Sequence, residues 1–389
     1  MNSASLSFLA LFLLSFGSIY ADSKPLPRLP VPPFYTTQAD IDRYLRLDTW
    51  SINLPALYVF GDSFVNAGNS LYLHIPSKAN YTPYGIDFRG VPTGRPTNGR
   101  LVVDFIAQVF GLPFPPPILG LSESQKKTIT TGLSFACSSA GILHMPPALV
   151  PILGNILSLD DQIQLFKDTI PMLKGQFDST ECFDSYMSKS LFFIHIGGND
   201  LGVYWELANL QKKFPKVKKY TSLLSEQLYS RLKAMYQLGA RKFLVNNVFP
   251  LGYQPVNLHL KMNGTSFIED MNQRAASFNA RLPKVLRKLE KSLKGSTFVL
   301  FDMYKLFEDV LAQPATYGFT NVKDSCCIDI SGNQTRPCRP NSVPCADRAS
   351  HVFFDPFHPS ESIHFLWLRR LLKDNSFCSP INLLQLIKS

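Results

Sequence analysis

Three residue types that together can carry out acyl transfer occur in this chain at the ends of apolar segments. Ser63 follows Gly-Asp, directly after the apolar run LYVF (57–60). Asp355 and His358 lie in FFDPFHP (353–359), where two prolines disfavour a continuous helix and favour a rigid turn that presents both side chains. A serine that attacks, a histidine that takes its proton and an aspartate that holds the imidazole are the minimum for nucleophilic acyl transfer.

A carboxamide stands at a second position of the same kind. Asn199 follows the apolar run LFFIHI (191–196) and two glycines. Because ligands bind at the carboxyl ends of the strands of an open parallel sheet, Ser63 and Asn199 should both lie at that edge. An amide there can donate a hydrogen bond to an oxyanion. Gly-Asp-Ser is also ordinary turn chemistry, so Ser63 alone is equally consistent with a structural turn.

Hydrophobic patterns predict the elements that position these residues. Continuous apolar runs, typical of parallel strands covered on both faces, occur at 57–60, 191–196, 243–248 and 297–301. Apolar residues recur at helical spacing between and after them, at 99–107, 223–238 and 278–289. Strands that alternate with helices predict an α/β fold with right-handed crossovers. No linker rich in Pro, Gly or Ser divides this pattern, so we predict one domain over residues 55–389.

Composition and motifs exclude several classes of protein. With 45% hydrophobic and 17% charged residues, the 389-residue chain does not have the composition of a disordered protein. It contains no G-x-S-x-G, H-E-x-x-H, G-x-G-x-x-G or P-loop motif, so no motif supports a nucleotide-binding protein, a metalloprotease or an ordinary α/β-hydrolase. The net charge of +10 suits an anionic membrane or an acidic cell-wall polymer, and we expect no nucleic acid partner.

The N-terminus, the cysteines and the sequons predict a secreted, extracellular glycoprotein. Residues 1–21 carry no charged side chain and contain an eleven-residue apolar run, which predicts a signal peptide. Residues 22–54 begin Pro-rich and should form an extended arm. Seven cysteines without a C-x-x-C pair predict disulfides rather than a metal site, with at least one thiol left over. Sequons place glycosylation at Asn80, Asn263 and Asn333.

Nine short segments, in order, make the chain resemble the plant GDSL esterase/lipase family within the SGNH hydrolases, over nearly all of residues 55–375. The segments are FGDSFVNAGNS (60–70), PYGIDF (83–88), GRPTNGRLVVDFIAQVFGLP (94–113), GLSFACSSAGI (132–142), SLDDQIQLF (158–166), FFIHIGGND (192–200), NNVFPLGYQP (246–255), DSCC (324–327) and FFDPFHPSE (353–361). The resemblance implies a three-layer α/β/α, flavodoxin-like fold with a mostly parallel sheet. It also implies a serine esterase or lipase that needs no metal and no organic cofactor.

The resemblance also implies a role for each site residue. Ser63 would be the nucleophile, His358 the general base and then acid, and Asp355 the residue that orients His358. Asn199 would donate to the oxyanion together with backbone N–H groups, including that of Ser63. The chain would thus cleave a small-molecule or lipid ester through an acyl-enzyme.

The chain departs from the family pattern at two positions. Phe64 stands where the signature has leucine, which is a mild apolar exchange. In ACSSAG (136–141), Ser139 takes the place of the glycine whose backbone N–H usually completes the oxyanion hole. A serine keeps this N–H, but a positive φ would impose strain of about 1–3 kcal/mol.

Two other functions remain open from the sequence. An acyltransferase would use the same site, with an alcohol in place of water. A binding glycoprotein with little catalytic activity would result if Ser139 had disabled the oxyanion hole. Three further features have structural interpretations: His195 as a core residue, Asp200 as a brace of its turn, and the basic run from Lys212 to Lys219 as a solvated face.

Overall fold

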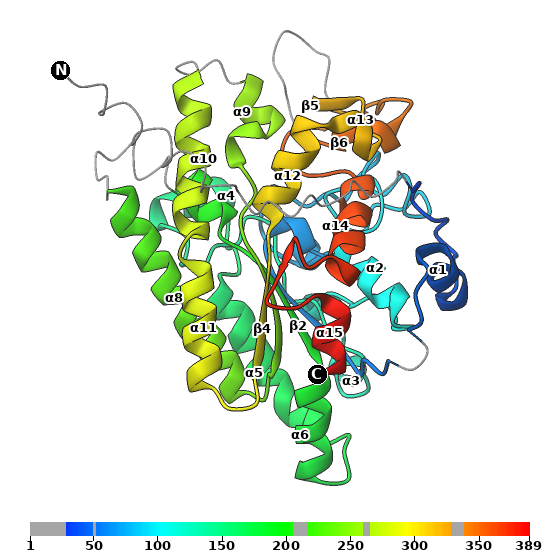
Figure 1. Ribbon diagram of the computed structural model, residues 1–389, viewed down its shortest axis with the longest axis vertical. Helices are drawn as coiled ribbons and strands as arrows, with labels where there is room; N and C mark the ends of the chain where they lie inside the picture. The colour runs from blue at the N-terminus through cyan, green and yellow to red at the C-terminus, as the bar shows by residue number, and fades with distance from the viewer. Residues whose placement is uncertain (1–28, 50–51, 205–215, 260–264, 328–337) are drawn as a thin grey trace, which may run out of the picture.

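A five-stranded sheet forms the centre of the molecule (Figure 1). The computed structural model describes residues 29–49, 52–204, 216–259, 265–327 and 338–389. The strands lie in the order β1-β2-β3-β4-β7. Neighbours among the first four pair in parallel, whereas β7 is antiparallel to β4. Their bounds are β1 Leu57–Gly61, β2 Leu191–His195, β3 Lys242–Asn246, β4 Thr297–Phe301 and β7 Cys378–Ser379. The four predicted strands and the mostly parallel sheet are confirmed.

The middle residues of the strands are apolar because both faces of the sheet are covered. All residues of β1, β2 and β3 are buried. Phenylalanines stack from strand to strand on one face, with the ring centroids of Phe243 and Phe298 4.4 Å apart. Burying each large apolar side chain stabilises the folded state by roughly 1.5–3 kcal/mol. The sheet, and with it the carboxyl ends of its parallel strands, is therefore held in place.

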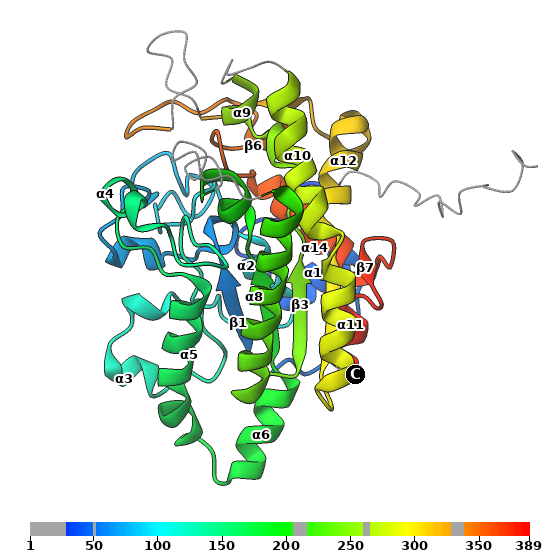
Figure 2. The same ribbon diagram turned by 90° about the vertical axis from the view of Figure 1, so that its left-hand side faces the viewer.

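Helices cover both faces of the sheet, which confirms the α/β/α layers (Figures 1 and 2). One layer contains α5 (Leu159–Lys174), α8 (Val217–Gln237) and α11 (Leu282–Ser292), with α10 (Thr265–Asn279) beside α8. The other contains α2 (Val102–Val109), α14 (Glu361–Lys373) and α15 (Leu383–Lys388), with α1 (Gln38–Leu45) outside α2. The shorter or more peripheral helices are α3 (Glu123–Lys126), α4 (Val150–Leu153), α6 (Thr180–Lys189), α9 (Pro255–His259), α12 (Met303–Ala312) and α13 (Pro314–Tyr317). None of the described helices is both long and apolar enough to cross a membrane.

Two predicted elements differ from the structure. The helical pattern at 278–289 spans two helices, because α10 ends at Asn279 and Pro283, which has no N–H to donate, lies in the first turn of α11. The arm at 22–54 is not extended throughout. Thr37 caps α1 by accepting a hydrogen bond from the N–H of Asp40, and α1 packs against α2. The predicted signal peptide, 1–21, lies outside the described residues.

A second, small hydrophobic cluster lies apart from the main core. Strands β5 (Asn321–Ser325) and β6 (His351–Phe353) form a two-stranded sheet beside it. Two disulfides, Cys326–Cys345 and Cys327–Cys338, join its loops. We call this group the satellite cluster; its buried members are Ala79, Tyr84, Cys326, Cys327, Cys338 and Phe354. Residues 355–358 follow β6 directly, so this cluster supports the segment that contains Asp355 and His358.

Candidate active site

Ser63 lies where β1 ends, at the carboxyl edge of the sheet. Gly61 has φ +150°, and a Cβ there would lie 2.1 Å from the backbone oxygen of His195, so the close approach to β2 requires glycine. Asp62 Oδ1 then accepts a hydrogen bond from the N–H of Phe64 at 3.1 Å, which starts a 3₁₀ turn at Ser63. Ser63 is partly exposed between buried neighbours. Within the described residues its hydroxyl has no structural hydrogen-bond partner and is therefore available to a substrate.

Side-chain amides fix the backbone on both sides of Ser63. Gln162, from α5, accepts a hydrogen bond from Gly61 N–H at 2.8 Å and donates one to Gly61 O at 2.9 Å. Asn66 accepts from the N–H groups of Gly68 and Asn69 and donates to Ser138 Oγ at 3.0 Å. Asn69 in turn donates to the backbone oxygens of residues 134 and 136. These bonds join the nucleophile turn to the loop that contains Ser139.

The loop at 137–143 is delivered to the same edge by a segment that runs beside β1. Phe135 and Cys137 donate their N–H groups to the backbone oxygens of Val59 and Gly61. Asn199 Nδ2 donates to Ala140 O at 2.9 Å. Ser139 and Asn199 are, like Ser63, partly exposed among mostly buried neighbours. The two predicted oxyanion donors therefore lie close together, because Ser139 is in this loop and Asn199 is hydrogen-bonded to it.

Ser139 has φ +63°, in the left-handed region. A non-glycine residue in this region is strained, so Ser139 carries the backbone strain expected for a positive φ. Asp200 holds the following residues, because its carboxylate accepts hydrogen bonds from the N–H groups of Ile142 at 2.8 Å and Leu143 at 3.0 Å. Asp200 thus braces the neighbouring loop, not only its own turn.

Asp355 and His358 form a hydrogen-bonded pair. His358 Nδ1 lies 2.8 Å from Asp355 Oδ2 and 3.0 Å from Oδ1. The backbone N–H groups of Phe357 and His358 also donate to Asp355 Oδ1, at 2.8 and 2.7 Å. Since the carboxylate accepts at Nδ1, this nitrogen carries the proton and Nε2 is left as a base. The imidazole lies beside the nucleophile turn, with its centroid 6.1 Å from that of the Phe64 ring.

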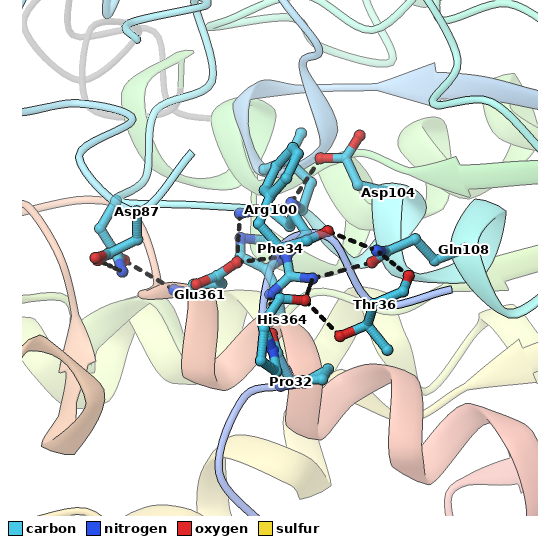
Figure 3. A network of polar contacts seen from close by, with 12 residues as sticks. Pro32, Phe34, Thr36, Asp87, Arg100, Asp104, Gln108, Glu361 and His364 are labelled. Carbon is cyan, nitrogen blue, oxygen red and sulfur yellow. Dashed lines mark hydrogen bonds and ion pairs between the residues drawn. The ribbon is translucent and has the colours of Figure 1, made fainter. Parts of the chain in front are cut away.

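A polar network anchors the chain directly after His358 (Figure 3). Arg100 donates from Nε to Glu361 Oε1 at 2.7 Å, and both side chains are buried. The same guanidinium donates to the backbone oxygens of Pro32 and Pro33 in the N-terminal arm. Just before Glu361, the Thr97 hydroxyl donates to Pro359 O at 2.9 Å. The start of α14, and with it the His358 turn, is tied to segment 97–100 and to the arm.

Burial sets the protonation of the groups around the site. It raises the pKa of Asp62 to about 7, against the opposing effects of the Phe64 N–H and of His358. It lowers the pKa of His195 to about 3, so this imidazole is neutral and packs between Phe64 and Trp367 as a core residue. Burial alone would raise the pKa of Asp355, but the charge and hydrogen bond of His358, with the hydrogen bond of Tyr84, hold it below its usual value. Asp355 is therefore ionised at neutral pH.

Two other places in the described chain were candidates for a site. Cys326, Cys345 and His351 have potential metal-ligating atoms within 4.8 Å of one another, but the two sulfurs are bonded to each other and offer no thiolate. A hollow of about 580 Å³ lies at the opposite end of the sheet, between α5, α6 and the end of α8. Its lining contains serines but no histidine to activate them, so the chemistry belongs to the Ser63 edge.

The remaining predictions have mixed outcomes. Disulfides are present, and Cys137, Cys182 and Cys378 are unpaired. Asn80 is exposed, while Asn263 and Asn333 lie outside the described residues. Of the basic run, the described lysines, Lys216, Lys218 and Lys219, are exposed, as a solvated face requires.

Five residues that hold the site together are not among those predicted from the sequence. They are Tyr84, Thr97, Arg100, Gln162 and Glu361, each of which makes a buried hydrogen bond or ion pair to the backbone or side chains around the site. All five fall within the short segments on which the family resemblance rests. A polar residue inside an otherwise apolar or Gly-rich segment was the available signal.

Comparisons with known proteins identify the family to which the chain is similar. Residues 57–371 match the family model described as GDSL-like Lipase/Acylhydrolase. A GDSL esterase/lipase of Arabidopsis thaliana is 34% identical over 98% of this chain and 98% of its own length. A second one is 36% identical over 86% of this chain and 91% of its own. GDSL esterase/lipase 7 of the same plant is 34% identical over 86% of this chain and 92% of its own.

Proposed function

The chain belongs to the GDSL-like lipase/acylhydrolase family, a family of carboxylic ester hydrolases, and we propose that it cleaves esters through an acyl-enzyme on Ser63. The observation that carries this proposal is the Asp355–His358 pair, which reaches the carboxyl edge of the sheet beside the turn of a partly exposed serine. The esterase activity predicted from the sequence agrees with the activity of this family. The named roles of the residues are our assignment.

The residues would act in the following order. His358 Nε2 takes the proton of Ser63 Oγ as the oxygen attacks the ester carbonyl, and Asp355 stabilises the imidazolium that forms. The resulting oxyanion accepts hydrogen bonds from Asn199 Nδ2 and from the backbone N–H groups of Ser63 and Ser139. His358 then gives its proton to the leaving alkoxide, so an alcohol departs. Water, deprotonated by His358 in the same way, attacks the acyl-enzyme, releases the acid and restores Ser63.

Variants of the nucleophile and the base test this assignment. We expect Ser63→Ala and His358→Ala each to lose at least about 10³-fold in kcat on a chain-length series of simple esters, because the triad acts as a unit. His74→Ala, at an exposed histidine outside the residues assigned to the site, is the control for loss of an imidazole. Turnover retained in either triad variant would contradict the roles assigned here. Ester exchange with an added alcohol, faster than hydrolysis, would instead favour the acyltransferase.

We propose that the protein is secreted and glycosylated. Two disulfides and an exposed sequon at Asn80 support an oxidising, extracellular location. Secreted protein should shift on a reducing gel and after glycosidase treatment. If neither shift occurs, this location is wrong.

An anionic surface is the partner that the charge distribution favours. The exposed face of α11 carries Lys284, Arg287, Lys288 and Lys291. Lys288 Nζ lies over the Tyr229 ring, 4.8 Å from its centroid, and no ion pair between the described residues involves any of the four. We define these four as the basic face of α11. Their spacing along one helix fits a linear polyanion, so binding to polygalacturonate should weaken steeply with salt and fall when the four are changed to glutamine. Equal binding by this variant would exclude the basic face as the docking surface.

A further inference from the structure

A buried tyrosine of the satellite cluster contacts the carboxylate of the candidate triad through its hydroxyl. Tyr84 is 6% exposed and donates from its hydroxyl to Asp355 Oδ2 at 2.7 Å. The two residues are 271 positions apart in the sequence. Nothing in the reaction scheme above uses this contact.

The hydrogen bonds of Asp355 show what Tyr84 adds. Oδ1 accepts from the backbone N–H groups of Phe357 and His358, which belong to the same turn as the carboxylate. Apart from His358, Tyr84 is the only described side chain that donates to Asp355. The backbone bonds hold one oxygen within its own turn, whereas the Tyr84 bond fixes the other oxygen relative to a distant segment. That second oxygen is the one closest to His358 Nδ1.

The position of Tyr84 is set by the satellite cluster. Its ring makes edge contacts with Tyr81 and Phe354, with centroids 5.3 and 5.7 Å away. Tyr81 donates its own hydroxyl to Cys338 O, next to the Cys327–Cys338 disulfide. Burial, followed by the charge of Asp355, raises the pKa of Tyr84 well above its usual value. The hydroxyl therefore remains a donor over the whole working pH range.

We propose that Tyr84 is a positioning residue for ester hydrolysis, which acts through Asp355 by fixing the carboxylate oxygen that holds His358. This inference rests on the function proposed above. The chemical reason is that proton transfer from Ser63 needs an imidazole held in one orientation, and the orientation is set by the hydrogen bond at Nδ1. A carboxylate free to turn about its own bond would hold the imidazole in several orientations.

The test compares Tyr84→Phe with Tyr186→Phe, which removes another buried tyrosine hydroxyl, one that donates from α6 to Thr130 O and lies outside the satellite cluster. Rates are expressed per active site, titrated with a serine-directed fluorophosphonate, so that a lower yield of folded protein does not affect them. We expect Tyr84→Phe to lower kcat by about 10-fold, the equivalent of one ordinary hydrogen bond, with KM unchanged. Tyr186→Phe should stay within about twofold of the wild-type kcat.

Two further readouts separate positioning from a merely structural role. The Tyr84 hydroxyl donates to the carboxylate and draws off part of its charge, so the acid limb of the kcat/KM profile should move to higher pH in Tyr84→Phe but not in Tyr186→Phe. Asp62 and His364, the other titratable groups that interact electrostatically with His358, are the same in all variants. In an Asp355→Asn background, Tyr84→Phe should cost less than twofold, because its effect passes through that carboxylate.

Each outcome decides the proposal. Equal kcat in Tyr84→Phe and Tyr186→Phe, or the same loss with and without the Asp355 carboxylate, would overturn it. If Ser63→Ala is inactive while Tyr84→Phe is fully active, only this inference fails. If Ser63→Ala is itself active, the proposed function fails first.

Discussion

The two halves of the candidate site are held by different physical means. The nucleophile half (residues 61–69, 134–143 and 199–200) extends from the main sheet and is fixed by side-chain amides and carboxylates bonded to backbone. The acid–base half (residues 353–361) follows β6 and is fixed by the satellite cluster, two disulfides and the Arg100–Glu361 ion pair. Catalysis requires that both halves be correctly placed, although the second half also depends on a hydrophobic cluster apart from the main core.

The difference teaches that stability and activity can be separated in this molecule. The main core determines whether the chain folds and where Ser63 lies. The satellite cluster determines where His358 lies, and it is small enough to loosen while the main core stays intact. Changes to each half should therefore have distinct signatures.

The largest expected effect in the nucleophile half is on the rate. Asn199→Ala removes a side-chain donor to the oxyanion and should lower kcat by about 10²–10³-fold. Asn247→Ala is the matched control, since Asn247 follows the neighbouring strand β3 but bonds to Asp302 and to the N–H of Tyr304. A loss in Asn199→Ala no greater than in the control would remove Asn199 from the oxyanion hole.

The next effect is on stability and depends on pH. The pKa of Asp62 is raised to about 7 in the folded protein, so the folded state binds this proton more tightly than the unfolded chain does. The corresponding stabilisation is complete below about pH 4 and is lost as the pH rises through 7. The side-chain oxygen of an asparagine at position 62 can still accept a hydrogen bond from the Phe64 N–H, but this side chain does not titrate. Asp62→Asn should therefore raise the free energy of unfolding at pH 8, by at most about 4 kcal/mol, relative to its effect at pH 4.

Urea denaturation of the wild type and Asp62→Asn at pH 4, 6 and 8 checks this. The gain must grow between pH 4 and 8. If the gain in the free energy of unfolding were the same at all three pH values, burial would not raise the pKa of Asp62.

A third change separates the two halves directly. Replacing Cys327 and Cys338 together with serine loosens the cluster that positions Tyr84 and the Asp355 turn. We expect kcat to fall by about 10-fold or more while far-UV circular dichroism keeps the signal of the main fold. Cys182→Ser, at an exposed unpaired cysteine, is the control. Unchanged kcat in the double variant would show that the acid–base half does not depend on the satellite cluster.

The smallest expected effect concerns Ser139. With φ at +63°, Ser139→Gly relieves left-handed strain and should raise kcat by at most about fivefold, the factor that 1 kcal/mol gives. The greater freedom of glycine in the unfolded chain offsets part of the gain in stability. Arg46→Gly, at an exposed residue with φ +53°, should affect stability alone. An unchanged rate in Ser139→Gly would mean that the oxyanion hole is already competent.

The sequence predicted the strands and the reacting residues but not the contacts that join the two halves. Uninterrupted apolar runs indicate buried parallel strands, and an element after each strand must lie at the edge of the sheet, which placed Ser63 and Asn199. The partner of a buried polar group is not encoded by periodicity, so the bonds from Tyr84 to Asp355 and from Arg100 to Glu361 could not be predicted. Cysteine counts predicted disulfides but not their pairing.

The φ of Ser139 lay beyond sequence reasoning for a similar reason. A serine adopts negative φ unless the surrounding structure imposes otherwise. Here Asn199 and Asp200, from another strand end, bind the loop directly after it. Only the assembled loop shows that the position demands a left-handed conformation.

Covalent labelling of Ser63 tests the central claim most directly, namely that the two halves meet to activate this serine. A fluorophosphonate should label the wild type once, on the peptide that contains Ser63, and should not label Ser63→Ala. The labelling rate of His358→Ala should fall by at least about 10²-fold, because the histidine supplies the base. Labelling at another serine, or equal rates with and without His358, would contradict the account.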